Sequence, residues 1–231
     1  MAVTMAFAIA VWLVQPTESV LWLMREEGPV ETATSALFFL LALVLYGLRP
    51  KLDDRRSWLA MVTLCAAAGA REMDWHKVWT GKSVLKLSFY LGPAPAHQKL
   101  LAGALVMLVA AGVIYLVRRH ALSLWRDLRA REPVAVTVAT LLVTTAITKV
   151  LDRSINLLIQ DHGIVAAPSI RALVAALEES MELGLPLMVT LAVWQYLREC
   201  PGPHRDLDNA RGAVAAPSSL SDTEFSKSER F

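Results

Sequence analysis

Long apolar runs separated by short polar stretches dominate the first 199 residues of the chain. A helix that crosses a membrane needs about 20 predominantly apolar residues. The pattern predicts an all-α fold, a polytopic membrane bundle of about six transmembrane helices. The third continues as an amphipathic extension through residue 79, and Gly184 and Pro186 interrupt the sixth. The predicted helices cover residues 2–24, 32–48, 58–70, 100–117, 133–151 and 170–197.

Prolines modify two of these helices. Pro16 has no amide hydrogen and is expected to kink the first helix beside Glu18. That helix either packs against a polar interior or lies partly in the membrane interface, and the sequence leaves both alternatives open. Pro133 occupies the first turn of the fifth helix, where a proline is favoured.

After Cys200 the composition changes to Pro, Ser and charged residues without apolar periodicity. Such a segment cannot bury enough apolar surface to offset the entropy lost on ordering. The predicted organisation is therefore a transmembrane bundle over residues 1–199 and a disordered cytoplasmic tail over residues 200–231.

The composition supports a membrane location. Of 231 residues, 55% are hydrophobic and only 19% are charged, and the mean hydropathy is +0.44. This chain is too apolar for an ordinary soluble domain, so the lipid bilayer is its expected partner. A formal net charge of +2 implies no nucleic-acid partner. Cys65 and Cys200 would lie at different depths, which argues against a disulfide.

The distribution of basic residues predicts the orientation. Arginine and lysine are concentrated in residues 49–56, in residues 118–131 and after residue 197. These segments belong on the cytoplasmic side, with both termini, in a multi-pass protein of the inner (cytoplasmic) membrane. The third connection disagrees, because it would place four lysines outside: Lys77, Lys82, Lys86 and Lys99.

Three clusters of ionisable residues interrupt the apolar pattern. In the predicted topology all three lie in the outer half of the membrane, where charge is costly and typical of a functional site. Together they predict one outward-facing buried acidic and histidine cavity. The first runs from Arg71 through Glu72 and His76 to Lys77, the second holds Lys149, Asp152 and Arg153, and the third holds Glu178, Glu179 and Glu182.

Helical spacing suggests what these clusters hold. Glu72 and His76 are four residues apart and share a face of a continuous helix, as do Glu178 and Glu182, and Glu179 is three residues from Glu182. Oxygen and imidazole ligands suit a divalent Mn, Fe or Zn ion. The same crowded carboxylates could instead hold a proton. The metal ligands or acid and base candidates are Glu72, His76, Glu178, Glu179 and Glu182.

Basic residues near the clusters are candidates for substrate binding or counter-charge. Lys149 shares a helical face with Asp152 and Arg153. Any single pair, such as Arg71 with Glu72, could equally be a structural salt bridge, and His76 could be an interfacial hydrogen-bonding residue. Arg71 or Arg153 is the expected counter-charge for the carboxylates. The full set is Arg71, Lys77, Lys149, Asp152 and Arg153.

The sequence lacks the motifs of several enzyme classes. It contains no Gly-x-Ser-x-Gly, His-Glu-x-x-His, Walker or Cys-x-x-Cys motif. Three functions remain. The first is cation- or proton-linked transport or sensing. The second is a membrane-embedded, metal-dependent enzyme that acts on a lipid or polyprenyl substrate. The third is a non-catalytic membrane scaffold.

Overall fold

The computed structural model describes residues 2–25, 28–48, 54–81, 83–162 and 167–199, with backbone only at residues 76, 152 and 154–162. Within these residues the chain is helical and contains no β-strand, which confirms the all-α prediction. The predicted tail and Lys82 lie outside the described residues. The helices are α1 (Ala2–Val14), α2 (Thr17–Leu23), α3 (Pro29–Gly47), α4 (Arg55–Glu72), α5 (Trp75–Thr80), α6 (Leu87–Leu91), α7 (Ala96–Arg129), α8 (Pro133–His162) and α9 (Pro168–Glu199).

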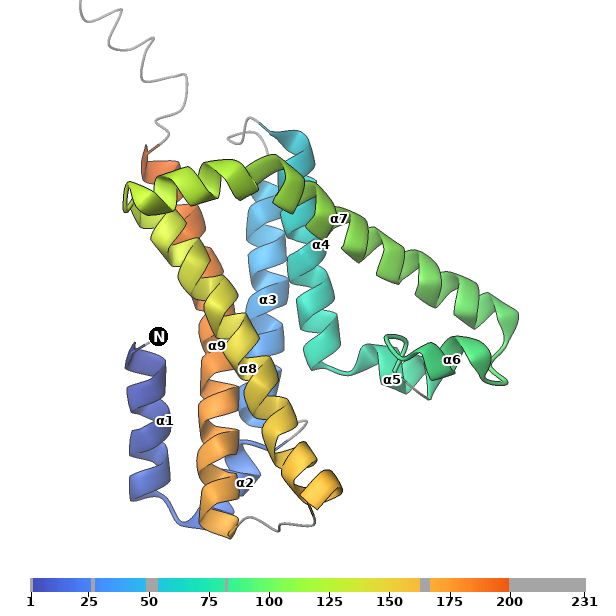
Figure 1. Cartoon of the computed structure of the whole chain (residues 1–231), viewed down its shortest axis with the longest axis vertical. Coiled ribbons are helices and arrows are strands. Elements are labelled where there is room, and N and C mark those ends of the chain that lie inside the picture. The colour runs from blue at the N-terminus through green and yellow to red at the C-terminus, as the bar shows by residue number, and fades with distance from the viewer. Residues whose placement is uncertain (1, 26–27, 49–53, 82, 163–166, 200–231) are drawn as a thin grey trace, which may run out of the picture. The chain divides into compact units, whose positions relative to one another are not determined.

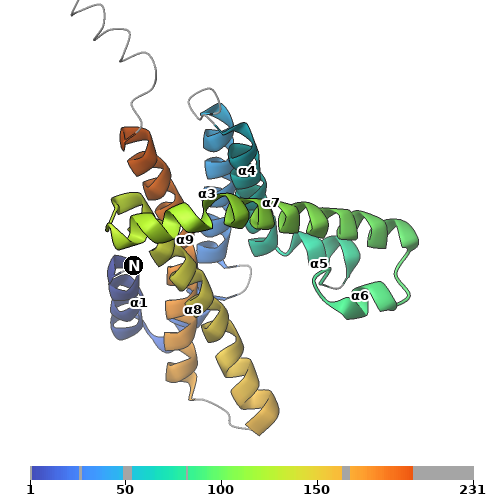
Figure 2. The same ribbon diagram turned by 45° about the horizontal axis from the view of Figure 1, so that its top comes forward.

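The residues up to Gln195 form one compact unit. In Figure 1, α3 and α4 run antiparallel side by side; α9 packs against both of them, and α8 is hydrogen-bonded to α9. Helix α7 crosses the upper end of α4, whereas α5 and α6 project to one side, as Figure 2 also shows. The end of α3, the start of α4 and the end of α7 therefore share one end of this unit.

The core where α3, α4 and α9 meet is apolar. Leu41 and Leu45 of α3 pack with Cys65 of α4, and Val189 and Val193 of α9 cover them. This cluster joins elements far apart in the sequence and therefore sets the relative rotation of the three helices.

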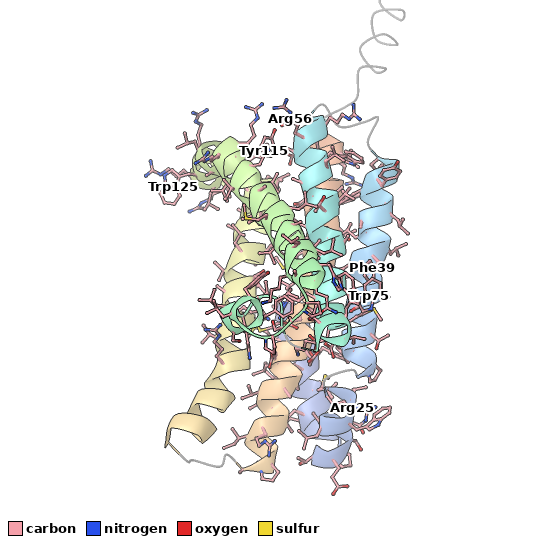
Figure 3. All side chains as sticks on the ribbon, turned by 90° about the vertical axis from the view of Figure 1, so that its right-hand side faces the viewer. Arg25, Phe39, Arg56, Trp75, Tyr115 and Trp125 are labelled. Carbon is pink, nitrogen blue, oxygen red and sulfur yellow. The ribbon has the colours of Figure 1, made fainter. Side chains whose placement is uncertain are left out.

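Close approach of α3 and α4 depends on Gly69. A Cβ atom at this position would lie 3.1 Å from the Phe39 ring, so a larger side chain would push the helices apart. The Phe39 ring in turn lies next to the Trp75 ring (Figure 3), and the two ring centroids are 5.3 Å apart. Gly69 thus fixes which turn of α4 faces which turn of α3.

The first predicted span is wrong as a continuous helix. The helix stops at Val14, and a separate short helix begins after Pro16. Because Pro16 cannot donate an amide hydrogen bond, the break falls where the proline interrupts the ladder. At 1.5 Å per residue, the 13 residues of α1 span about 20 Å, less than a bilayer core of about 30 Å. Ala8 and Val20 pack against Ala172 and Ala176 of α9.

The amphipathic extension predicted through residue 79 is also wrong as part of one helix. Helix α4 ends at Glu72, and Asp74 adopts a left-handed backbone conformation with φ of 49° before α5 begins. Short polar residues such as aspartate tolerate this conformation better than most. Glu72 and His76 therefore belong to different helices, and their spacing of four does not place them on one face.

In the part of the chain that the structure describes, three helices are long and apolar enough to cross a membrane. Their apolar segments are Pro29–Gly47, Ala96–Arg129 and Pro133–Leu151. Side chains along α7 are largely exposed, including Leu100 at 75% and Met107 at 70%. Exposed apolar side chains on a long helix are compatible with a lipid-facing surface. These helices support a membrane protein, whereas the count of six spans stays a prediction.

Asp54 caps the start of α4. Its carboxylate accepts hydrogen bonds from the backbone amides of Arg56 at 3.0 Å and Ser57 at 3.2 Å. Capping of this kind satisfies amides that have no partner within the helix. The backbone amide of Ser57, and next its hydroxyl, lower the pKa of the Asp54 carboxyl from 3.8 to about 2. The cap therefore stays ionised at every physiological pH.

We expect Asp54→Ala to lower the melting temperature in detergent by a few degrees at pH 7, because two amides lose their acceptor. The lowered pKa means that the carboxylate stabilises the fold fully above about pH 4, and this contribution is lost as the pH falls towards about 2. The difference from the unmodified protein should therefore shrink over that range. Asp54→Asn, which keeps a hydrogen-bond acceptor, should lower the melting temperature less than Asp54→Ala does. A constant difference from pH 7 to pH 2 would contradict this account.

Candidate functional site

The end of α4 contributes the first buried carboxyl. Glu72 is the last residue of the helix and is only 8% exposed. The guanidinium Nη1 of Arg71 lies 3.1 Å from Glu72 Oε1, but the Arg71 side chain is itself 46% exposed. The charge of Glu72 at the end of this apolar helix is thus partly neutralised by a guanidinium group that is accessible to water.

The middle of α9 contributes the second buried carboxyl. Glu182 is 6% exposed, and its Oε1 accepts a hydrogen bond of 2.9 Å from Lys149 Nζ of α8. Pro186 follows one turn later inside the same helix. Proline has no amide hydrogen, so the carbonyl of Glu182 lacks its usual partner four residues ahead. Helix α9 nevertheless continues through Gly184 and Pro186, so the predicted interruption of the sixth helix is wrong.

The structure brings the two carboxyls together. The carboxyl groups of Glu72 and Glu182 lie close enough to interact directly. An ionised carboxylate only accepts hydrogen bonds, so a hydrogen bond between the two carboxyls would require one proton on the pair. Glu179 lies within electrostatic range of Glu72 and Glu182. It is also within range of Glu178 and of Glu31 at the start of α3. Residues from three helices thus form an acidic cluster, with Lys149 of a fourth beside it.

Other predicted site residues lie elsewhere or take different partners. Lys149, and not Arg153, is the counter-charge of Glu182, and the Arg153 side chain is exposed. Lys77 pairs with Asp74, three residues before it. The side chains of His76 and Asp152 lie outside the described residues.

The predicted metal site gains no support from the described side chains. Among them, no group of three or more His, Cys, Asp or Glu residues could hold a metal ion. One proposed ligand, His76, is not among the side chains described, so metal binding stays a prediction.

A second polar cluster, missed in the sequence, joins the start of α4 to α7. The Ser57 hydroxyl donates to Asp54 Oδ2 at 2.9 Å and lies 2.7 Å from His120 Nε2. Because the single hydroxyl hydrogen points to Asp54, His120 Nε2 must carry a hydrogen and donate it to Ser57. Tyr115 and Arg119 of α7 approach the same carboxylate at 3.3 and 3.5 Å.

This second cluster is not a catalytic triad. In a triad the carboxylate orients the histidine, whereas Asp54 binds the serine hydroxyl itself. Its contacts tie α4 to α7 over more than 60 residues. The cap signal Asp54-Arg55-Arg56-Ser57 before an apolar run could have revealed the start of α4. No local sequence feature indicates that His120 of α7 lies next to Ser57.

Two cavities lie away from the carboxyl cluster. One of about 250 Å³ is lined by residues from Thr80 to Gln98, between α5, α6 and the start of α7. The other, of about 520 Å³, lies between α3 and α4 and is lined by Tyr46, Arg55, Trp58 and Leu59. We assign the candidate site to the buried carboxyls rather than to these cavities, because paired charge in an apolar interior is the costlier feature.

The carboxyl cluster combines buried carboxyls with partly exposed basic groups. Comparison with known proteins adds no family assignment. No protein-family model, curated protein or solved structure matches this chain.

Proposed function

We propose that this chain is a multi-pass protein of the inner (cytoplasmic) membrane that binds and releases a proton at the Glu72–Glu182 pair during cation- or proton-linked transport or sensing. The observation that carries the proposal is the close approach of these two buried carboxyls. Ionisable groups inside membrane segments are rare and typical of proton or ion pathways.

Proton occupancy would control how α4 and α9 pack. With one shared proton the two carboxyls attract each other, whereas two carboxylates in an apolar interior repel. Lys149 offsets part of the negative charge on Glu182. Loss of the shared proton would therefore favour a second arrangement of the two helices, which is the behaviour that a transporter or a sensor needs.

The proposed depth agrees with this role. Glu182 lies 14 residues after Pro168, or about 21 Å along α9. In the predicted topology this position is near the middle of a bilayer core about 30 Å thick. In a bundle of six spans, the Glu72–Glu182 pair would then be accessible from the outer side of the membrane.

The proposal is tested by infrared difference spectroscopy of the full chain in lipid nanodiscs. We expect a protonated carboxylic-acid band at neutral pH that disappears in both Glu72→Gln and Glu182→Gln, because either change removes the shared proton. Glu132→Gln, at an exposed position, should keep the band. In proteoliposomes the two variants should also lose any proton flux measured with a pH-sensitive dye.

Other outcomes favour the alternatives. A band that survives in either variant would reduce the pair to a structural contact and support a membrane scaffold. Stoichiometric metal in the purified protein, lost in Glu182→Gln and His76→Ala, would instead support the metal-dependent lipid enzyme.

The proposed orientation makes a separate prediction. Basic residues at the shared end of α3, α4 and α7 favour the cytoplasmic side. A reporter fused after Cys200 should therefore be cytoplasmic, and one inserted near Gly163 external, as read by alkaline phosphatase and fluorescent-protein fusions. The opposite pattern would move the carboxyl cluster to the inner half of the membrane.

A further inference from the structure

The end of α7 carries a group of exposed arginines. Helix α7 has 34 residues and is therefore about 51 Å long, whereas the core of a bilayer is about 30 Å thick. The long apolar run of this helix ends at Val117, so the segment 118–129 continues beyond the length that a membrane core needs. Its four arginines are all exposed: Arg118, Arg119, Arg126 and Arg129.

Contacts with α4 fix the rotation of this segment. His120 Nε2 lies 2.7 Å from the Ser57 hydroxyl, and Arg119 Nε lies 3.5 Å from Asp54 Oδ2. These contacts join the segment to the capped start of α4. They determine which side of α7 meets α4 and which side is turned away from it.

Another side of the segment combines positive charge with large apolar side chains. Arg118, Leu122, Trp125 and Arg129 follow one another at spacings of four, three and four residues, which places them on one side of the helix. Leu122 is 81% exposed and Trp125 is 58% exposed, and the guanidinium of Arg129 lies 5.0 Å from the centre of the Trp125 ring. Arg126 lies at the edge of the same side. We call these five residues the basic face of α7.

The positive charge of the basic face is not compensated within the chain. In the part of the chain that the structure describes, no carboxylate forms an ion pair with Arg118, Arg126 or Arg129. Asp127, the one acidic residue of the segment 118–129, is partly buried and lies on the opposite side of the helix. A negatively charged ligand would therefore complement the basic face.

Neither water nor hydrocarbon suits this combination of side chains. Leucine and tryptophan gain free energy by leaving water, whereas arginine is costly in hydrocarbon. The headgroup layer of a membrane suits both, because tryptophan is enriched there and arginine binds phosphate. Figure 3 shows Trp125 at the edge of the molecule, at the end that also carries Arg56. A soluble anion would leave Leu122 and Trp125 in water.

We propose that the basic face of α7 binds the phosphate groups of anionic phospholipids, with Leu122 and Trp125 inserted between the lipid molecules. Arginines without carboxylate partners favour a lipid of net negative charge, such as phosphatidylglycerol, over phosphatidylcholine, which carries its own ammonium group. The inference rests on the membrane location in the proposed function and does not depend on the Glu72–Glu182 pair. It goes beyond proton binding because it assigns a lipid partner.

Thermal unfolding of the full chain in an uncharged detergent tests the lipid site, with phosphatidylglycerol or phosphatidylcholine added in increasing amounts. Phosphatidylglycerol should raise the melting temperature saturably, and phosphatidylcholine should raise it less. Arg118→Gln combined with Arg129→Gln should weaken the apparent affinity for phosphatidylglycerol about tenfold or more, because each arginine near an anionic surface contributes a factor of roughly five. Equal stabilisation of the unmodified protein by the two lipids would overturn the proposal.

Arg153→Gln combined with Arg171→Gln is the matched control, because it removes the same number of exposed arginines from α8 and α9. This variant should keep the phosphatidylglycerol affinity of the unmodified protein. Arg118→Lys combined with Arg129→Lys preserves the charge and should keep most of that affinity. A loss in the control as large as that in the glutamine variant of the basic face, or an equal loss in the lysine variant, would overturn the proposal.

Native mass spectrometry provides a measurement that does not depend on unfolding. The unmodified protein should retain more phosphatidylglycerol than the Arg118→Gln, Arg129→Gln variant, and equal retention would contradict the assignment. Inorganic phosphate should not stabilise the protein, and stabilisation equal to that by phosphatidylglycerol would make a soluble anion the ligand instead. Glu182→Gln should keep the phosphatidylglycerol response, so failure of the lipid site is distinguishable from failure of the proposed function.

Discussion

Trp58→Ala is expected to lower the free energy of unfolding by about 3 kcal/mol or more. The indole is 3% exposed and lies between α3 and α4, where its ring is 5.6 Å from that of Tyr46. Its Nε1 donates to the backbone carbonyl of Leu45. The alanine variant removes this packing and leaves a cavity that the neighbouring helices fill only in part.

The measurement is thermal or denaturant unfolding in a mild detergent. Trp22→Ala provides the matched control, because that side chain is 59% exposed and its loss should change stability little. Trp58→Phe keeps most of the ring but no N–H donor, so its loss should be intermediate. Equal stability of Trp58→Ala and Trp22→Ala would mean that the α3–α4 contact does not hold the unit together.

Lys149→Met should be the second most damaging change. It removes the ammonium 2.9 Å from Glu182 and leaves a carboxylate with little access to water. Breaking a fully buried ion pair costs about 3–5 kcal/mol, and we expect about 1–3 kcal/mol here because the lysine side chain is 37% exposed.

A double variant separates the pair from general damage. Lys149→Met combined with Glu182→Gln should recover much of the stability lost in Lys149→Met, because no unpaired charge remains. Arg153→Met, which alters an exposed residue one turn further along α8, should change stability within experimental error. Additive losses in the double variant would show that Lys149 and Glu182 act independently.

The local pattern predicted the helices well where it was unambiguous. Pro133 and the apolar run after it predicted the start of α8, and the run from residue 32 predicted most of α3. The break after Val14 was only partly anticipated, because a proline predicts a kink without saying whether the helix resumes in the same direction. At Asp74 the sequence favoured continuation, since charged residues at helical spacing resemble an amphipathic turn.

By itself the sequence determined that the chain is helical, that apolar helices long enough for a membrane are present, and that carboxylates interrupt them. These properties depend on composition and on the 3.6-residue period, which neighbours in the chain set. Only the tertiary structure decided that Lys149 reaches Glu182, that Glu72 meets it and that His120 reaches Ser57. Those contacts depend on the rotation and register of helices, which packing such as Phe39 against Gly69 sets and no local pattern records.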